Sequence, residues 1–184
     1  MYLQQSQEQK PAGAMIIAIT SGKGGVGKTN IATNLSLCMA ADNQRVILMD
    51  ADLGLGNLDV LMNLNCRYNL SHVVAGQRTL QQITQTGPCG IEVICGGSGI
   101  ERLANLSTFQ RQRLIEELDS LQDRSDVIIL DTGAGIHSTV IGFCLAADHT
   151  LVVTTPEPTA MTDAYAMIKV LAAKDYTGRI SLLV

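Results

Sequence analysis

A glycine-rich run near the amino terminus carries the clearest chemical signature in the 184 residues. Gly22 is followed, after four intervening residues, by Gly27, Lys28 and Thr29. Glycines allow backbone N–H groups to converge on phosphate oxygens without obstruction by side chains. A lysine at this spacing reaches the terminal phosphates of a nucleotide, and the threonine hydroxyl coordinates Mg²⁺. The spacing predicts a phosphate-binding loop, the alternative being a glycine-rich turn that matches the pattern by chance.

Acidic residues follow two other apolar segments. Asp50 and Asp52 come directly after residues 46–49, and Asp131 follows residues 127–130. Side chains two positions apart on a strand point to the same side, so Asp50 and Asp52 can address one magnesium–phosphate site. The alternative is a polar strand end whose carboxylates are solvated. The candidate metal ligands are Thr29, Asp50 and Asp131.

The segments that must position these residues alternate in type. Short apolar runs, typical of buried strands, occupy residues 15–19, 46–49, 91–95, 127–130, 151–153 and 180–184. Helical spacing lies between several of them, at Ile31, Leu35 and Cys38, at Leu114, Leu118 and Leu121, and at Met161, Tyr165 and Ile168. Residues 107–110 match a capping box that would begin the second of these helices. The alternation predicts an α/β fold of three layers, with a mostly parallel central sheet flanked by helices.

The chain divides into a short tail and one domain. Residues 1–13 are rich in glutamine and lack apolar periodicity, so we expect a flexible N-terminal tail. Residues 14–184 are long enough to bury a core without disulfide or metal support. In a parallel sheet, ligands bind beyond the carboxyl ends of the strands, which is where the glycine run and the aspartates fall.

Composition excludes several classes of function. Hydrophobic residues make up 46% and the formal net charge is −4, which gives no overall attraction to nucleic acid or to an anionic bilayer. No apolar run approaches the roughly 18 residues of a membrane span. The five cysteines are scattered, and we interpret them as small buried hydrophobic residues. The three histidines lack metal-ligand spacing and are assigned structural or surface roles.

Lys23 is a departure from an ordinary phosphate loop. Residues 22–29 resemble the deviant Walker A loop of the MinD/ParA ATPases, P-loop NTPases of the SIMIBI type, in which the early lysine contacts phosphate across an ATP-sandwiched dimer. The resemblance implies MgATP binding, a homodimer when ATP is bound, and catalytic roles for Lys23 and Lys28. The alternative for Lys23 is a solvated charge. The predicted nucleotide contacts are Gly22, Lys23, Gly24, Gly25, Val26, Gly27, Lys28, Thr29 and Asn30.

The resemblance extends to the acidic residues. Asp50 and Asp52 match the switch I aspartates of the family, and Asp52 is implied to orient the attacking water. Asp131 matches the Walker B aspartate, which holds Mg²⁺ through its water shell. Relatives usually carry proline or alanine where Gly133 stands, and glycine should loosen the backbone there. Residues matching Glu157, Thr159 and Asp163 contact the early lysine in MinD relatives; alternatively these residues begin a helix, with Thr159 as its cap.

Four further segments, residues 50–59, 68–76, 131–136 and 154–165, resemble the FlhG/FleN (YlxH) branch of regulators of flagellar number. This resemblance implies an ATPase switch that hydrolyses ATP to ADP and regulates flagellar number and placement. Expected partners are the SRP-type GTPase FlhF, flagellar switch components or a flagellar transcription activator. We expect a cytoplasmic location, with peripheral contact at the inner face of the membrane. Residues 2–9 show no clear counterpart of the GTPase-activating motif that some relatives carry.

Residues 180–184 resemble a strand at which relatives continue into an adenine-recognising segment and a membrane-binding helix. We therefore expect the family's C-terminal part to be missing here, with membrane contact only where such a helix exists beyond residue 184.

Three alternative functions stay open: a ParA/MinD-like positioning ATPase acting on DNA or division proteins, a nucleotide-gated binding module with little turnover, and an iron–sulfur carrier on the same fold. The first requires a basic surface, and with a net charge of −4 we do not expect specific nucleic-acid binding. The last requires bridging cysteines, an arrangement that Cys95 and Cys144 lack.

Overall fold

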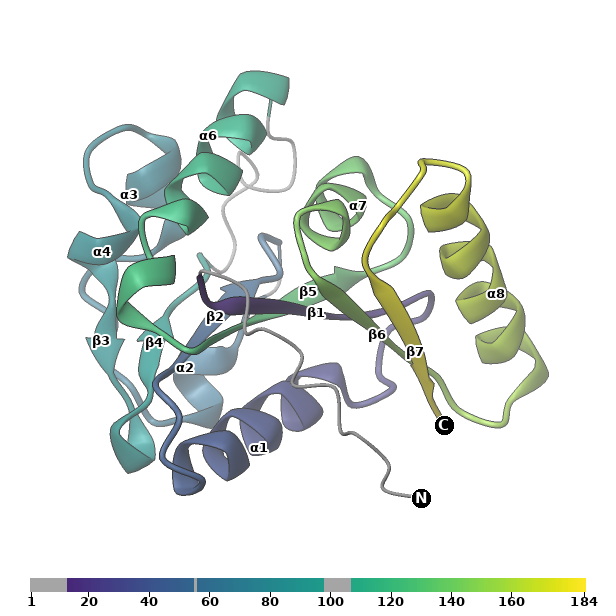
Figure 1. Ribbon diagram of the computed structural model, residues 1–184, viewed down its shortest axis with the longest axis horizontal. Coiled ribbons are helices and arrows are strands. Elements are labelled where there is room, and N and C mark those ends of the chain that lie inside the picture. Colours follow the sequence, from purple (N-terminus) through teal and green to yellow (C-terminus); the bar gives the residue numbers. More distant parts are fainter. Residues whose placement is uncertain (1–12, 55, 98–106) are drawn as a thin grey trace, which may run out of the picture.

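A seven-stranded sheet forms the centre of the computed structural model, which describes residues 13–54, 56–97 and 107–184 (Figure 1). The strand order is β3-β4-β2-β5-β1-β6-β7, and β3 alone among these strands runs antiparallel to its neighbour. The strands are β1 (Met15–Ser21), β2 (Val46–Ala51), β3 (Gln85–Thr86), β4 (Glu92–Ile94), β5 (Val127–Ala134), β6 (His149–Val153) and β7 (Arg179–Leu183).

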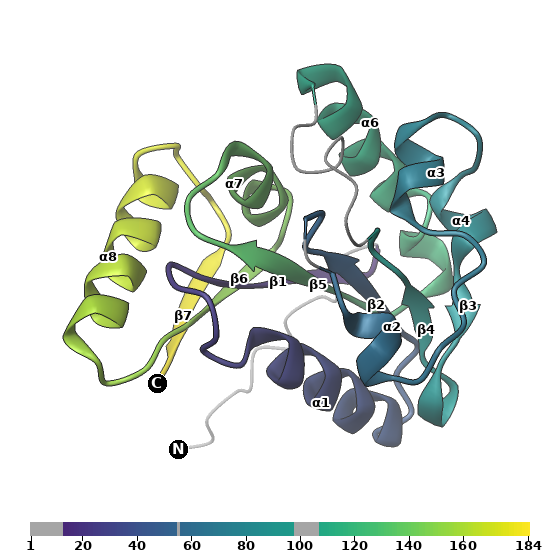
Figure 2. The same ribbon diagram turned by 180° about the vertical axis from the view of Figure 1, so that it is seen from behind.

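Helices cover both faces of this sheet. One face carries α1 (Lys28–Ala41) and α2 (Leu58–Leu61), as the view from behind shows (Figure 2). The other carries α3 (Leu70–Val74), α4 (Leu80–Ile83), α6 (Thr108–Asp119), α7 (Ser138–Leu145) and α8 (Pro158–Ala172). Two short 3₁₀ helices, η1 (Pro88–Gly90) and η2 (Gln122–Arg124), precede β4 and β5. The predicted three-layer α/β fold with a mostly parallel sheet is confirmed.

The central strands are apolar along their whole length because both of their faces are buried. In β5, Ile128 and Leu130 pack into the core beneath α3, α6 and α7, whereas Ile129 packs into the core beneath α1. Successive side chains of a strand point to opposite faces, so a strand between two helical layers needs apolar residues at every position. This explains why β1, β2 and β5 read as unbroken apolar runs.

The capping box that begins α6 is confirmed. Ser107 Oγ accepts from the backbone N–H of Gln110 at 3.2 Å, and Gln110 Oε1 accepts from the backbone N–H of Ser107 at 3.0 Å. Comparable boxes begin α3, at Asn69 and His72, and α4, at Thr79 and Gln82. These two short helices, α2 and strand β3 were absent from the sequence-based assignment because each is too short to show a period, whereas β4 lies within the strand predicted at residues 91–95.

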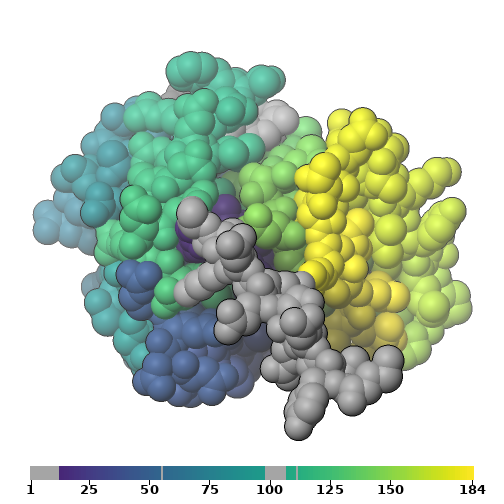
Figure 3. Space-filling view, in the orientation of Figure 1, coloured from purple at the N-terminus to yellow at the C-terminus, as the bar shows by residue number. Residues whose placement is uncertain are grey.

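Among the predicted strands, the boundary differs most at β5. The run predicted at residues 127–130 continues as a strand to Ala134, so Asp131 lies inside the strand and not after it. The run predicted at residues 180–184 forms β7, which pairs with β6 on one side and lies at the surface along its other edge (Figure 3). Of the predicted tail, only Gly13 falls among the described residues. No helix in the described part of the chain is long and apolar enough to cross a bilayer.

The interpretation of the cysteines was wrong in part. Cys144 is buried, as expected, but Cys38 and Cys89 are exposed. Cys66 and Cys95, which are 29 positions apart in sequence, form a disulfide. The sequence could not predict this pairing, because it depends on the loop after α2 folding back onto the end of β4.

Replacing Ser107 by alanine should lower the free energy of unfolding by about 1 kcal/mol, because a first-turn N–H of α6 loses its acceptor. Replacing Ser107 by glycine should cost only a few tenths of a kcal/mol, since glycine suits the N-cap backbone. Urea unfolding of both variants measures the difference, and equal stability of Ser107→Ala and wild type would show that the cap contributes nothing.

Candidate functional site

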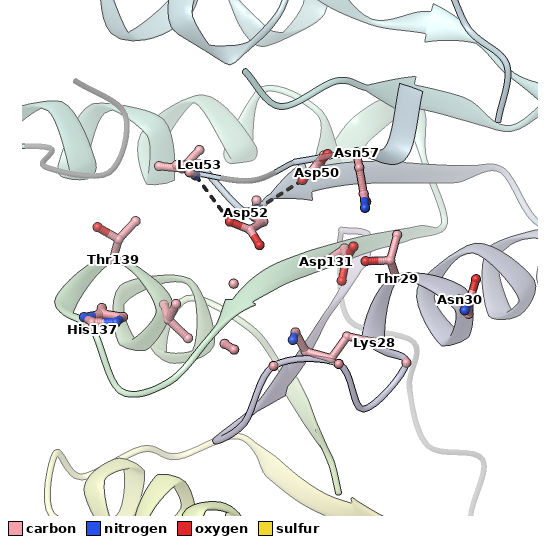
Figure 4. Close-up of a pocket in the computed structure, with 18 of the residues that line it drawn as sticks. Lys28, Thr29, Asn30, Asp50, Asp52, Leu53, Asn57, Asp131, His137 and Thr139 are labelled. Carbon is pink, nitrogen blue, oxygen red and sulfur yellow. Dashed lines mark hydrogen bonds between the residues drawn. The ribbon is translucent and has the colours of Figure 1, made fainter. Parts of the chain in front are cut away.

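The ends of β1, β2 and β5 surround a cavity of about 820 Å³ at the carboxyl edge of the sheet (Figure 4). The glycine-rich loop forms one wall, the segment after β2 forms the opposite wall, and the start of α7 forms the third. Side chains from all three segments point into it. The lining residues include Gly24, Gly25, Gly27, Lys28, Thr29, Asn30, Asp50, Asp52, Leu53, Asn57, Asp131, Gly133, His137 and Thr139.

The loop glycines leave room where side chains would otherwise project. Gly25 and Gly27 adopt φ values of +78° and +96°, a left-handed conformation that other residues rarely reach. A Cβ atom built on Gly24, Gly25 or Gly27 would meet no other atom within 4 Å, so the loop forms an open cradle beside the cavity. Gly27 is also the N-cap of α1 and provides no side-chain acceptor for the first-turn N–H groups. Such free N–H groups at a helix start favour an anion.

Gly22 is required for a different reason. A Cβ atom there would lie 2.3 Å from the backbone carbonyl carbon of Asp163 in α8. Gly22 thus lets the loop pass closely over α8. Gly22, Lys23 and Val26 do not line the cavity, whereas the other six predicted nucleotide contacts do.

Two aspartates are buried next to each other at the floor of the cavity. Asp50 and Asp131 are paired in the β2–β5 register, and each is 2% exposed. Asp50 accepts hydrogen bonds from the backbone N–H groups of Asp52 and Leu58, both at 3.2 Å. Burial nevertheless raises the pKa of Asp50 to about 7, because removing a carboxylate from water outweighs these two bonds.

The carboxylate oxygens of Asp131 are less completely hydrogen-bonded than those of Asp50. The Thr29 hydroxyl donates to it, but within the described residues Oδ1 of Asp131 is buried without any hydrogen-bond partner. Burial raises the pKa of Asp131 to about 6, against the stabilising effect of Thr29 and of the Lys28 charge. Burial also lowers the pKa of Lys28, which the carboxylates of Asp131 and Asp52 partly oppose. Buried acceptors of this kind suit a divalent cation, which prefers oxygen ligands.

Asp52 projects from the segment after β2 into the cavity (Figure 4). Its Oδ1 accepts from the backbone N–H of Gly54 at 3.3 Å. A Cβ atom on Gly133 would lie 3.4 Å from the same oxygen, so the glycine in β5 gives the Asp52 carboxylate space. The side chain is therefore held over the cavity by its own turn and can approach a ligand bound below it.

Lys23 lies outside the cavity and is paired with α8. Its Nζ donates to Glu157 Oε2 at 2.6 Å, and the side chains are 42% and 62% exposed. This hydrogen bond and the adjacent positive charge lower the pKa of Glu157. The expected contact of the early lysine with Glu157 is thus present. The suggestion that Thr159 caps the helix is wrong, because Glu157 occupies the N-cap position and makes no side-chain cap bond.

The histidines divide into structural and cavity residues. His72 belongs to the box that begins α3, and His149 Nε2 contacts Ser181 Oγ at 2.9 Å. His137 lines the cavity as the N-cap of α7. The site list drawn from the sequence omitted several lining residues, among them His137, Leu53, Asn57 and Thr139. Asn57 could have been found, because it belongs to the same acidic, glycine-rich segment as Asp50 and Asp52.

A family model described as an AAA domain matches residues 14–180. The antiactivator FleN of Pseudomonas aeruginosa is 44% identical over 156 residues, which cover 85% of this chain and 56% of FleN. The flagellum site-determining protein YlxH of Helicobacter pylori is 42% identical over 154 residues, which cover 84% of this chain and 52% of YlxH. The chain belongs to the MinD/ParA family of P-loop ATPases.

A solved structure of this family has the same arrangement. The septum site-determining protein MinD of Pyrococcus horikoshii, determined in complex with Mg-ADP, superimposes with a TM-score of 0.80 at 27% identity. The match covers 91% of this chain and 68% of that protein. The chain spans only about half the length of FleN and YlxH.

The raised pKa of Asp131 makes stability pH-dependent. Between its ordinary value of 3.8 and about 6, Asp131 holds a proton in the folded chain that the unfolded chain has released. The free energy of unfolding should therefore fall as pH rises through this window. The asparagine in Asp131→Asn is uncharged, like the protonated carboxyl group. Its amide would take the place of the carboxylate whose Oδ1 has no partner among the described residues. At pH 8, without nucleotide or metal, this variant should be more stable than wild type by roughly 1–2 kcal/mol.

Urea unfolding at pH 8 and pH 5 measures this effect, and the difference should shrink at pH 5, where wild-type Asp131 is itself protonated. The exposed Asp119 on α6 supplies the control, since Asp119→Asn should change stability by less than about 0.5 kcal/mol at either pH. If Asp131→Asn is less stable than wild type at pH 8, burial of the ionised Asp131 carboxylate does not destabilise the folded chain.

Proposed function

We propose that this chain is the nucleotide-binding part of a MgATP-dependent ATPase switch. The observation that carries the proposal is the meeting of three features at one cavity: an open glycine cradle, the buried Lys28, and the unpartnered Oδ1 of Asp131. A buried oxygen without a partner is unfavourable in the absence of a ligand, and the three features together match a nucleotide phosphate with its magnesium. The Mg-ADP complex of the related Pyrococcus horikoshii MinD supports the same ligand.

The residues fit such a ligand in a simple way. The loop N–H groups and Lys28 would hold the phosphates, and Thr29, Asp50 and Asp131 would hold Mg²⁺, directly or through its water shell. A divalent cation held by these residues would neutralise phosphate charge. Asp50 and Asp131 must release any proton to take this role, which their raised pKa values make dependent on pH. Asp52 would orient the water that attacks the terminal phosphate, yielding ADP.

The Lys23–Glu157 pair supports nucleotide-dependent assembly. An exposed ion pair is screened by water and contributes little to stability, so little free energy opposes its opening. We propose that Lys23 leaves Glu157 and contacts the phosphates of a second copy when ATP is bound. A homodimer would then supply a positive charge to the transferring phosphate from outside the chain that binds it.

The process regulated is proposed to be flagellar number and placement. The support is the similarity to FleN and YlxH, of which this chain covers about half. The proposed partners stay those of the sequence-based expectation: the GTPase FlhF, flagellar switch components or a flagellar transcription activator. A cytoplasmic location follows from the same proposal. The alternative, a ParA-like protein on DNA, would show salt-dependent DNA binding in the presence of ATP.

Lys28→Ala should weaken Mg-ADP binding at least about tenfold, since a hydrogen bond to a charged group contributes roughly 1.5–3 kcal/mol. Calorimetry on the folded chain provides the measurement. Lys174→Ala, an exposed lysine after α8, should bind as wild type does. Unchanged affinity in Lys28→Ala, or no affinity for ATP or ADP in wild type, would refute the nucleotide site.

Asp52→Ala should retain MgATP binding and lose at least about 10²-fold in turnover, because the attacking water is no longer oriented. It should also accumulate the dimer in size-exclusion chromatography with light scattering. Lys23→Ala should remain monomeric under the same MgATP conditions. A dimer in Lys23→Ala, or normal turnover in Asp52→Ala, would contradict the corresponding role.

A further inference from the structure

Cys66 and Cys95 join two segments that both hold Asp50. Cys66 lies in the loop between α2 and α3, and Cys95 follows β4 directly. Their Cα atoms are 6.4 Å apart, within the range of roughly 4.4–6.8 Å that disulfides span, and the structure contains the bond. Elsewhere in the described residues, Cys38, Cys89 and Cys144 are free thiols.

The first of these segments contacts Asp50 through backbone groups. Leu58 donates its N–H to Asp50 Oδ2 at 3.2 Å, eight positions before Cys66. A Cβ atom on Gly56 would lie 2.6 Å from the same oxygen, so this backbone passes directly against the carboxylate.

The second segment closes over the carboxylate from β4, the strand next to β2. A Cβ atom on Gly96, the residue after Cys95, would lie 2.9 Å from Asp50 Cγ. The carbonyl oxygen of Cys95 accepts from the backbone N–H of Leu70 at 3.1 Å, which ties the start of α3 to the same point. Asp50 is therefore enclosed between two stretches of backbone, and the disulfide links the segments to which they belong.

The two sulfurs differ in access. Cys66 is half-buried, whereas Cys95 is 2% exposed. An external oxidant can therefore reach Cys66 first, and Cys95 is placed to complete the reaction from within. In a reducing compartment a disulfide of this kind is usually transient and redox-sensing.

We propose that Cys66 and Cys95 are a reversible redox modification site that sets the magnesium affinity of Asp50, an inference that rests on the proposed function. The Cys66 thiolate attacks glutathione disulfide, forms a mixed disulfide and releases one glutathione. The Cys95 thiolate then attacks Cys66 Sγ and releases the second. Two thiols lose two electrons and two protons, and one glutathione disulfide becomes two glutathione thiols.

The oxidised form should bind Mg-ADP more tightly. The bond restricts the separation of the segments around Asp50, so less conformational freedom is lost when Mg²⁺ binds. We expect about a threefold lower Kd in the oxidised form. Binding of ADP in EDTA should be the same in both forms, because Asp50 acts only through the metal.

The experiment has two independent readouts on the same protein. Samples equilibrated with defined ratios of glutathione disulfide to glutathione are quenched in acid, alkylated and analysed by mass spectrometry. Cys66 and Cys95 should lose alkylation together as the ratio rises and retain no glutathione, whereas Cys38 and Cys89 can form only mixed disulfides, which gain the mass of glutathione. Calorimetry then compares Mg-ADP affinity in the oxidised and reduced samples.

Cys66→Ser should bind Mg-ADP as the reduced form does at every ratio, and Cys66→Ala repeats this test in a second, apolar background. Cys38→Ser, exposed on α1, is the matched control and should keep the redox difference. Full alkylation of Cys66 and Cys95 at all ratios would overturn the modification site, and equal affinities in the two forms would overturn its coupling to Asp50. A lack of Mg-ADP affinity in both forms would refute the nucleotide site instead, while the alkylation result would still decide whether the thiols pair.

Discussion

The close burial of Asp50 and Asp131 at the carboxyl ends of β2 and β5 constrains every other feature of the site. Two carboxylates removed from water at neighbouring positions of a sheet are unfavourable, and their raised pKa values express this. Backbone N–H groups, Thr29 and Lys28 compensate in part, but one oxygen of Asp131 has no hydrogen-bond partner in the part of the chain that the structure describes. The folded chain therefore carries an unfavourable free energy of burial at these two carboxylates, which a bound cation would reduce. Such a disadvantage is typical of a binding site and is hard to explain as a means of stabilising the core.

The glycine-rich loop complements these carboxylates across the cavity. Its positive-φ glycines direct backbone N–H groups without placing a Cβ in the open space, and α1 begins immediately after it. A negatively charged ligand is thus favoured on the loop side and a cation on the carboxylate side. The two halves of the cavity thus suit a nucleotide phosphate together with its magnesium.

Lys23 and the Cys66–Cys95 pair lie at the periphery of this arrangement and can change without rebuilding it. The Lys23–Glu157 pair is exposed and can exchange partners at little cost in free energy. The disulfide is attached to the backbone around Asp50, so it can alter the freedom of the carboxylate while leaving the sheet intact. The Lys23–Glu157 pair is also expected from the resemblance to the family. The Cys66–Cys95 disulfide, in contrast, is visible only in the structure of this chain.

The sequence alone determined the layers of the fold and most of the site. Unbroken apolar runs at β1, β2 and β5 require burial on both faces, and residues that directly follow such runs must lie at one edge of a parallel sheet. That reasoning placed Lys28, Thr29, Asp50, Asp52 and Asp131 at one edge of the sheet, and all five line the cavity there. It could do so because each residue lies next in sequence to the strand that positions it.

Only the tertiary structure decided the features that join distant segments. The contact between Gly22 and α8, the partner of Lys23, the place of His137 at the cavity wall, and the pairing of Cys66 with Cys95 all depend on how loops fold back. Short helices such as α2 and α3 are held by contacts with the core and by caps, and their sequences contain too few turns to reveal a period. Local patterning carries information about an element and its ends, whereas the distance between two elements is set by packing that no local pattern records.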